Sequence, residues 1–147
     1  MDYWQQQMQA GNQALAAHQP AQAEQCYKQA LKDVWPIWFH SCFIECPAEL
    51  AQEQACLPTF CLAATVRNLA ESYARQKRWR RGQRILRQAL HWFERGAEQM
   101  AAEHPAALAV LTQTAALRQD YQQLKWRQHC SGKPVVWINP EPTALLH

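Results

Sequence analysis

Four cysteines, at Cys42, Cys46, Cys56 and Cys61, stand close together in the chain, and His40 precedes them. Structural zinc sites take thiolate and imidazole ligands, commonly as two pairs separated by a few residues. The spacing therefore allows a zinc site or a thiol sensor. However, the stretch lacks a Cys-x2-Cys pair and turn glycines, and free cysteines are readily buried in helical cores. We expect these thiols to fill the core, with metal binding as the alternative.

No other group of residues has the spacing of a catalytic or cofactor site. The sequence contains no phosphate-binding loop, no His-Glu-x2-His motif and no nucleophile elbow. Glu45, Glu49 and Glu53 recur at four-residue steps on a polar stretch, which is typical of the exposed face of a short helix. We therefore expect a protein that is not an enzyme and needs no cofactor.

Basic residues are concentrated in one short segment. Seven of the 15 lysines and arginines lie between Arg75 and Arg87, with no acidic residue among them. Arg80, Arg84 and Arg87 are spaced so that they form one row on a helix. Such a row attracts acidic or phosphate-bearing partners, although many charged rows are only the hydrated side of a helix. Because the net charge is only +3 and no stacking platform accompanies the row, an acidic protein is favoured over nucleic acid.

The composition predicts one all-α domain. The chain has 147 residues, only 4 glycines and 48% hydrophobic residues, and it is rich in Ala and Gln. No apolar run reaches the ~20 residues of a membrane span. The first residues have neither the basic region nor the apolar core of a signal peptide, so the six cysteines are expected to be reduced. These observations predict a cytoplasmic protein without a membrane partner.

Apolar residues recur at steps of three and four in five segments, as one face of a helix requires. These predicted helices are Tyr3–Ala17, Pro20–Trp35, Pro58–Gln76, Trp79–Ala101 and Ala106–Gln128. Pro36 either ends or kinks the second of them. Residues 36–58 are predicted to be an insertion with a short helix at 48–53. The helical domain is expected at 1–129 and an extended tail at 130–147.

The first two pairs of predicted helices share a pattern of small and large residues. Gly11 is followed twelve positions later by Ala23, and Ala70 is followed at the same separation by Gly82. A large residue and then an alanine follow four and seven positions further on in both pairs. Small residues at these places let two antiparallel helices approach closely. The pattern resembles the tetratricopeptide repeat, most closely in residues 68–90.

The resemblance implies two antiparallel helical hairpins, separated by the 36–58 insertion and closed by the final helix as a cap. The equivalent alanines, Ala30 and Ala89, are 59 residues apart. That separation is not a multiple of the family's ~34-residue repeat, which is why an insertion is needed. The layout is also similar to that of small bacterial repeat proteins.

In tetratricopeptide proteins the first helix of each pair lines a groove that binds extended peptides. At matching positions the resemblance places Asn12 in the first pair, and Arg67, Asn68, Glu71 and Arg75 in the second. The two asparagines match those with which the family grips a peptide backbone. A methionine stands where the family's carboxylate clamp has its first lysine. A loose peptide groove is therefore expected rather than a receptor for a C-terminal carboxylate.

The resemblance and the arginine row together predict an adaptor or chaperone-like module. It would bind a peptide or an acidic partner through the groove, with the row as an electrostatic guide. The alternative is a zinc-binding or thiol-sensing protein built on Cys42–Cys61. The aromatic run Trp35–Phe39, or Trp137 in the tail, offers a contact for a homo-oligomer, because exposed apolar patches often mark interfaces.

Overall fold

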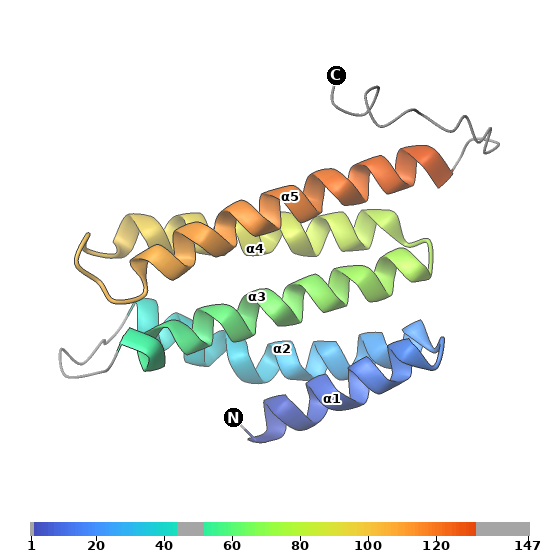
Figure 1. The fold of residues 1–147 in the computed structure, drawn as a ribbon, viewed down its shortest axis with the longest axis horizontal. Helices are drawn as coiled ribbons and strands as arrows, with labels where there is room; N and C mark the ends of the chain where they lie inside the picture. Colours follow the sequence, from blue (N-terminus) through green and yellow to red (C-terminus); the bar gives the residue numbers. More distant parts are fainter. Residues whose placement is uncertain (1, 44–51, 132–147) are drawn as a thin grey trace, which may run out of the picture.

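Five α-helices account for most of the computed structural model, which describes residues 2–43 and 52–131 (Figure 1). The helices are α1 (Asp2–Ala16), α2 (Pro20–Phe43), α3 (Gln52–Arg75), α4 (Trp79–Gln99) and α5 (Ala107–Ser131). Successive helices run antiparallel and pack side by side, and α3 also contacts α5. Within these ranges no strand occurs, so the predicted all-α class is confirmed. None of the described helices is both long enough and apolar enough to cross a membrane.

The middle of the chain departs from the sequence prediction. Helix α2 continues through Pro36 to Phe43, and α3 begins before Pro58, so both prolines lie inside helices. Most of the predicted 36–58 insertion is therefore an extension of α2 and α3; residues 44–51 lie outside the described residues. Pro36 is tolerated because it lies on the exposed side of α2. Water can reach the carbonyl that proline leaves without a partner there.

The last helix also exceeds its prediction. It ends at Ser131, so Cys130 belongs to α5 and not to a tail. Residues 132–147, including Trp137, lie outside the described part of the chain.

Two turns with the same geometry create two hairpins, which we call hairpin one (α1 and α2) and hairpin two (α3 and α4). His18 and Lys77 have left-handed φ angles of 59° and 58°. Each donates its N–H to the carbonyl three residues earlier, and Gln19 and Arg78 each donate to the carbonyl five residues earlier. This pair of bonds is the Schellman motif, which ends a helix and satisfies its last carbonyls. The two predicted hairpins are thus present and turn alike.

The predicted close approach of the paired helices is confirmed at both glycines. A Cβ atom on Gly11 would lie 2.5 Å from the ring of Tyr27 in the facing helix. On Gly82 it would lie 3.2 Å from the carbonyl of Ala70 and 2.8 Å from Leu124 of α5. A larger residue would push the helices apart, so glycine is needed here for proximity rather than for backbone freedom.

The core lies along α2, α3 and α4. Trp38 and Phe93 are its largest apolar members, and both are fully buried with their rings 5.2 Å apart. The indole N–H of Trp38 donates to the hydroxyl of Thr59 at 3.2 Å, which satisfies its polar atom in the core. Trp35 and Phe39, from the same aromatic run, are only partly buried.

A buried carboxylate joins the two hairpins. Glu24 is 3% exposed, and it accepts hydrogen bonds from Arg78 at 2.8 Å and Gln76 at 3.0 Å, near the turn of hairpin two. Lys28 forms an ion pair with it at 2.6 Å. Burial alone would raise the pKa of Glu24, but the bonds from Lys28 and Gln76 and the nearby cations outweigh it, and the pKa is lowered. The carboxylate is therefore held in its charged form.

Candidate functional site

A cleft of about 340 Å³ lies between α3 and α5. Its polar lining comes from Arg67, Asn68 and Glu71 of α3 and from Asp120, Gln123 and Arg127 of α5. Three of the residues predicted for the groove are thus brought together. The contribution of α5 was not predicted, because that helix was expected to be a cap. The polar residues of α5 recur at steps of three and four, and this signal could have revealed a second lining helix.

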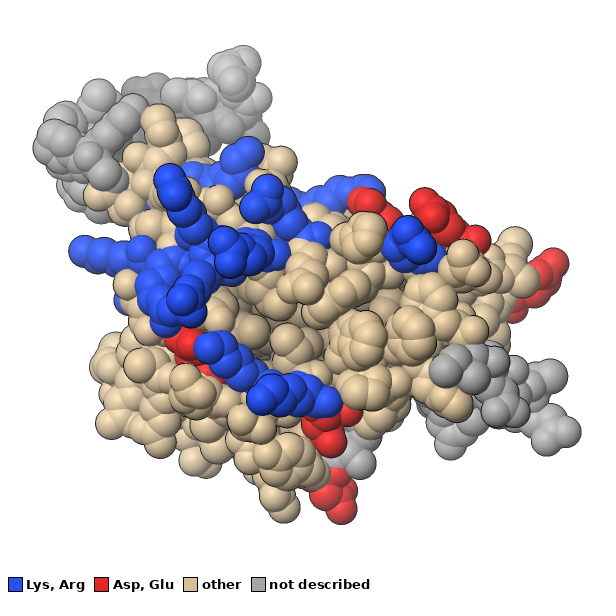
Figure 2. Space-filling view, turned by 180° about the vertical axis from the view of Figure 1, so that it is seen from behind, with Lys and Arg blue, Asp and Glu red and all other residues tan. Residues whose placement is uncertain are grey.

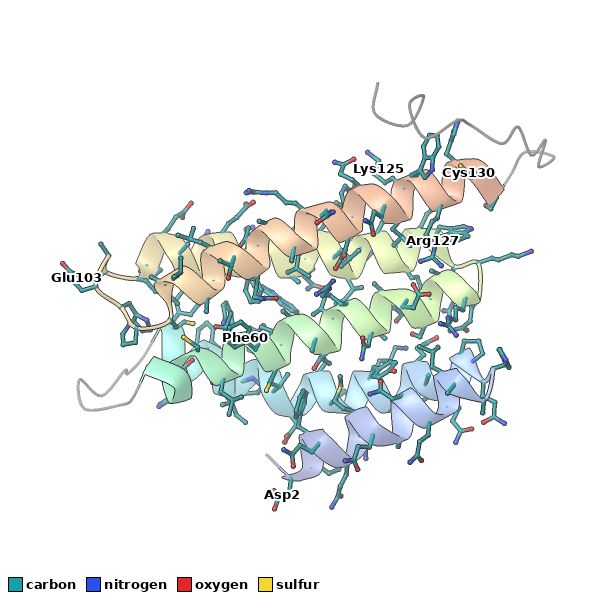
Figure 3. All side chains as sticks on the ribbon, in the orientation of Figure 1. Asp2, Phe60, Glu103, Lys125, Arg127 and Cys130 are labelled. Atoms are coloured by element: carbon teal, nitrogen blue, oxygen red, sulfur yellow. The ribbon has the colours of Figure 1, made fainter. Side chains whose placement is uncertain are left out.

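The cations of this cleft are neutralised by acids of the same chain. Arg67 forms an ion pair with Asp120 at 2.5 Å. Glu71 pairs with Arg127 at 2.6 Å and with Arg75 at 3.2 Å, and Figure 3 shows Arg127 on the side of α5 that faces α3. Burial would raise the pKa of Glu71, but its bonds to Arg127 and Arg75 prevail and lower it. An acidic ligand would have to displace these internal partners.

The two asparagines meet, but they are engaged with each other and with the core. Asn68 donates its side-chain N–H to Oδ1 of Asn12 at 3.2 Å, and the hydroxyl of Tyr27 donates to the same oxygen at 2.6 Å. Arg75 also reaches across to the carbonyl of Leu15 at 3.4 Å. These contacts hold α1 against α3, so the asparagine pair has a structural task that the sequence alone did not predict.

The predicted arginine row lies on α4. Arg80, Arg84 and Arg87 are exposed on α4, and none of them forms an ion pair with an acid in the described ranges. Steps of four residues continue the row to His91 and Arg95, which are also exposed. Figure 2, which shows the molecule from behind, has Lys and Arg side chains gathered at one end. This surface therefore carries several positive charges that have no acidic partner among the described residues.

The described cysteines of the predicted cluster are buried in the core and are not arranged as metal ligands. Cys42, Cys56 and Cys61 are buried, and Cys56 donates its thiol proton to the carbonyl of Pro105 at 3.4 Å. Burial raises the pKa of Cys61, which disfavours the thiolate that zinc needs. In the described ranges no three His, Cys, Asp or Glu residues are grouped to hold a metal ion. Cys46 lies outside those ranges, so elemental analysis of protein purified without a chelator remains the test of the zinc alternative.

No protein-family model matches the chain, and neither curated proteins nor solved structures yielded a match. The interpretation of the site therefore depends on its own geometry.

Proposed function

We propose that this chain is a non-enzymatic adaptor, of the tetratricopeptide type and of cytoplasmic location, which binds an acidic protein partner. The observation that carries the proposal is the row formed by Arg80, Arg84 and Arg87, which is exposed and has no internal ion pairs among the described residues. Support for the family comes from the paired small residues and the repeated turn. The spacing of 59 residues between Ala30 and Ala89 makes these units longer than the family's usual repeat.

The arginine row is a better receptor for carboxylates than the cleft between α3 and α5. In the cleft, a ligand carboxylate must replace Asp120 or Glu71, so every bond gained is offset by one lost. On α4 the guanidinium groups are exposed, so a ligand carboxylate that binds them displaces only solvent and counterions. Moreover, the first turn of α4 has no acidic residue. The positive end of the helix dipole therefore adds to the charge of Arg80 and its neighbours.

The expected affinity of this surface is modest. Exposed ion pairs contribute about 0.2–1 kcal/mol each, so three new pairs correspond to a gain in affinity of roughly 3-fold to 100-fold. Salt screens such pairs strongly, because the Debye length is only about 8 Å at physiological ionic strength. The cleft between α3 and α5 would serve as a second, more weakly selective contact for an extended peptide.

A fluorescent oligoglutamate peptide tests the proposal by anisotropy at low and at physiological salt. The variant R80Q/R84Q/R87Q removes three charges from the row. The matched control R67Q/R75Q/R127Q removes three charges from the cleft and its edge. We expect about a tenfold loss of affinity for the first variant and less than about a twofold loss for the second.

An equal loss in both variants would show that only net charge matters, and this would contradict a specific surface on α4. A larger loss in the cleft variant would move the binding site to the groove predicted from the family resemblance. Thermal unfolding of both variants checks that the comparison concerns folded proteins, since the cleft variant loses internal ion pairs.

A further inference from the structure

Beside the arginine row, α2 and α4 enclose a groove lined mainly by aromatic rings. Its volume is about 240 Å³. The lining comprises Trp35, Phe39 and Phe43 of α2 and His91, Trp92 and Arg95 of α4, above the buried Trp38. His91 and Arg95 also continue the arginine row by helical spacing, so the row and the groove share one edge.

The aromatic rings on α2 stack on one another along the groove. Trp35 stacks on Phe39 with centroids 5.2 Å apart and planes inclined by 22°. Phe39 stacks on Phe43 at 4.7 Å and 23°, and Trp92 leans against Trp35 at 5.7 Å and 60°. Because the rings cover one another's faces, they offer little for a nucleic-acid base to stack on. Their edges instead suit an inserted aliphatic or aromatic side chain.

Trp35, one of the rings that line the groove, carries a hydrogen-bond donor without a partner among the described residues. The indole nitrogen Nε1 of Trp35 is buried, and none of the described residues accepts a hydrogen bond from it. Leaving a buried donor unpaired is costly. Because Nε1 of Trp35 is closed to solvent, a ligand acceptor reaches it only when the inserted side chain displaces a neighbouring ring. The main-chain carbonyl of a peptide, next to an inserted side chain, is such an acceptor.

The rim of the groove is basic on the α4 side. Neither His91 nor Arg95 forms an ion pair with an acid among the described residues. The neighbouring Glu94 is engaged by Arg118 of α5 at 2.9 Å. Glu98 follows Arg95 by three residues and marks the end of the basic row. The groove is thus apolar inside and positive along one edge.

We propose that the acidic partner carries a large apolar side chain that inserts into this aromatic groove. Its flanking carboxylates would lie along the arginine row, and a carbonyl beside the anchor would accept the N–H of Trp35. The inference deepens the proposed function, and it assumes that the row binds an acidic protein. The recognised element is then an acidic peptide with one aromatic or large aliphatic anchor.

Two labelled peptides of equal length and charge separate this inference from the proposed function. One is an acidic peptide with a central alanine, and the other has tryptophan in its place. Wild-type protein should bind the tryptophan peptide about tenfold more tightly, as expected for burying one aromatic anchor. Equal affinities would overturn the groove proposal and leave the row intact. Failure of both peptides to bind at low salt would overturn the proposed function as well.

Two variants and two matched controls locate the anchor. W35F keeps the stacked rings and removes the donor, and it should weaken binding of the tryptophan peptide several-fold without changing that of the alanine peptide. R95E reverses one charge on the rim and should weaken both peptides. The controls W126F and K125E make matching changes at exposed positions of α5 and should affect neither. Weakening of both peptides by W35F, or by the α5 controls, would contradict the assignment.

Other occupants of the groove give different outcomes. If a second copy of the chain fills it, light scattering will show a dimer that W35F or R95E dissociates, and the peptide will bind only to the monomer. If single-stranded DNA displaces the tryptophan peptide at a lower concentration than unlabelled peptide does, the site recognises nucleic acid. Either result would overturn the peptide assignment.

Discussion

Hairpin one and hairpin two share their backbone design but not their surfaces. Each turn has one left-handed residue followed by a new helix, and each pair of helices meets at a glycine. In α1, however, Asp2 is the only Asp, Glu, Lys or Arg, whereas α4 carries five arginines. Turn and contact residues therefore specify the hairpin, while the outer positions are free to differ in charge. Function is therefore to be sought where the hairpins differ.

The largest difference in the free energy of unfolding is expected between two variants that each remove a polar contact from one hairpin to the segment packed against it. Glu24 of α2 binds Arg78 beyond α3, and Gln83, at the equivalent position in α4, donates to Gln128 of α5 at 2.6 Å. Removing one member of a buried ion pair costs up to about 3–5 kcal/mol. Because the cationic partners of Glu24 are about one-third exposed, we expect about 2–3 kcal/mol for E24A. Gln83→Ala should cost about 1 kcal/mol. Urea unfolding followed by circular dichroism measures both, and equal losses would contradict the contrast.

The two glycines should also differ in their tolerance of substitution. In Gly11→Ala the new methyl group meets the fully buried ring of Tyr27, which cannot turn away. We expect a loss of about 2 kcal/mol after the gain in helix propensity is included. In Gly82→Ala the closest atom is the end of the Leu124 side chain, which can shift, and the backbone carbonyl of Ala70 lies 3.2 Å from the new methyl group. That loss should stay below about 1 kcal/mol. Urea unfolding measures both losses of stability, and a greater loss for Gly82→Ala than for Gly11→Ala would contradict the prediction.

The dependence of stability on pH should follow the two carboxylates with lowered pKa values, Glu24 and Glu71. A depressed folded-state pKa stabilises the protein above the unfolded value of about 4.3, and this stabilisation is lost as the pH falls through the folded pKa. The free energy of unfolding should therefore decrease below about pH 4. E24Q should be less stable at neutral pH and should lose less on acidification. A parallel decrease in E24Q and wild type would exclude Glu24 as a source of the acid sensitivity.

The smallest effects are expected at the two turns, and they should be equal. His18→Gly and Lys77→Gly each relieve the left-handed strain of a residue with a side chain, at the cost of greater freedom in the unfolded chain. Each should stabilise the protein by about 0.5 kcal/mol. The control Ala16→Gly, at a helical position of α1, should destabilise it by about 1 kcal/mol. Unequal changes in the free energy of unfolding at His18 and Lys77 would show that the two turns differ in spite of their similar φ angles.

The sequence was most informative where local rules decide the structure. The small residues at Gly11 and Gly82 predicted the hairpins, and the spacing from Arg80 to Arg87 predicted an exposed row. The predicted end of α2 and the predicted start of α3 were wrong, because proline was expected to interrupt a helix. Pro36 lies inside α2, on its exposed side. Whether a proline breaks a helix depends on which side of the helix faces water, and that is a tertiary property.

The charge state of the cleft could not be predicted in the same way. Arg67 is paired with Asp120, which lies 53 residues away, and Glu71 with Arg127, 56 residues away. Nothing local in the sequence indicates that α5 runs beside α3 with Asp120 opposite Arg67 and Arg127 opposite Glu71. The row on α4 was predictable because its members are neighbours on one helix, so only their spacing had to be known.

The uneven placement of charge along α4 has a kinetic consequence. Its first half carries Arg80, Arg84 and Arg87, whereas in its second half Arg95 lies between Glu94 and Glu98. Glu103 marks the loop beyond it (Figure 3). An approaching acidic molecule is therefore turned toward the arginine end before any contact forms. Such steering accelerates encounter and leaves the lifetime of the complex nearly unchanged. Added salt should thus slow association more than it hastens release.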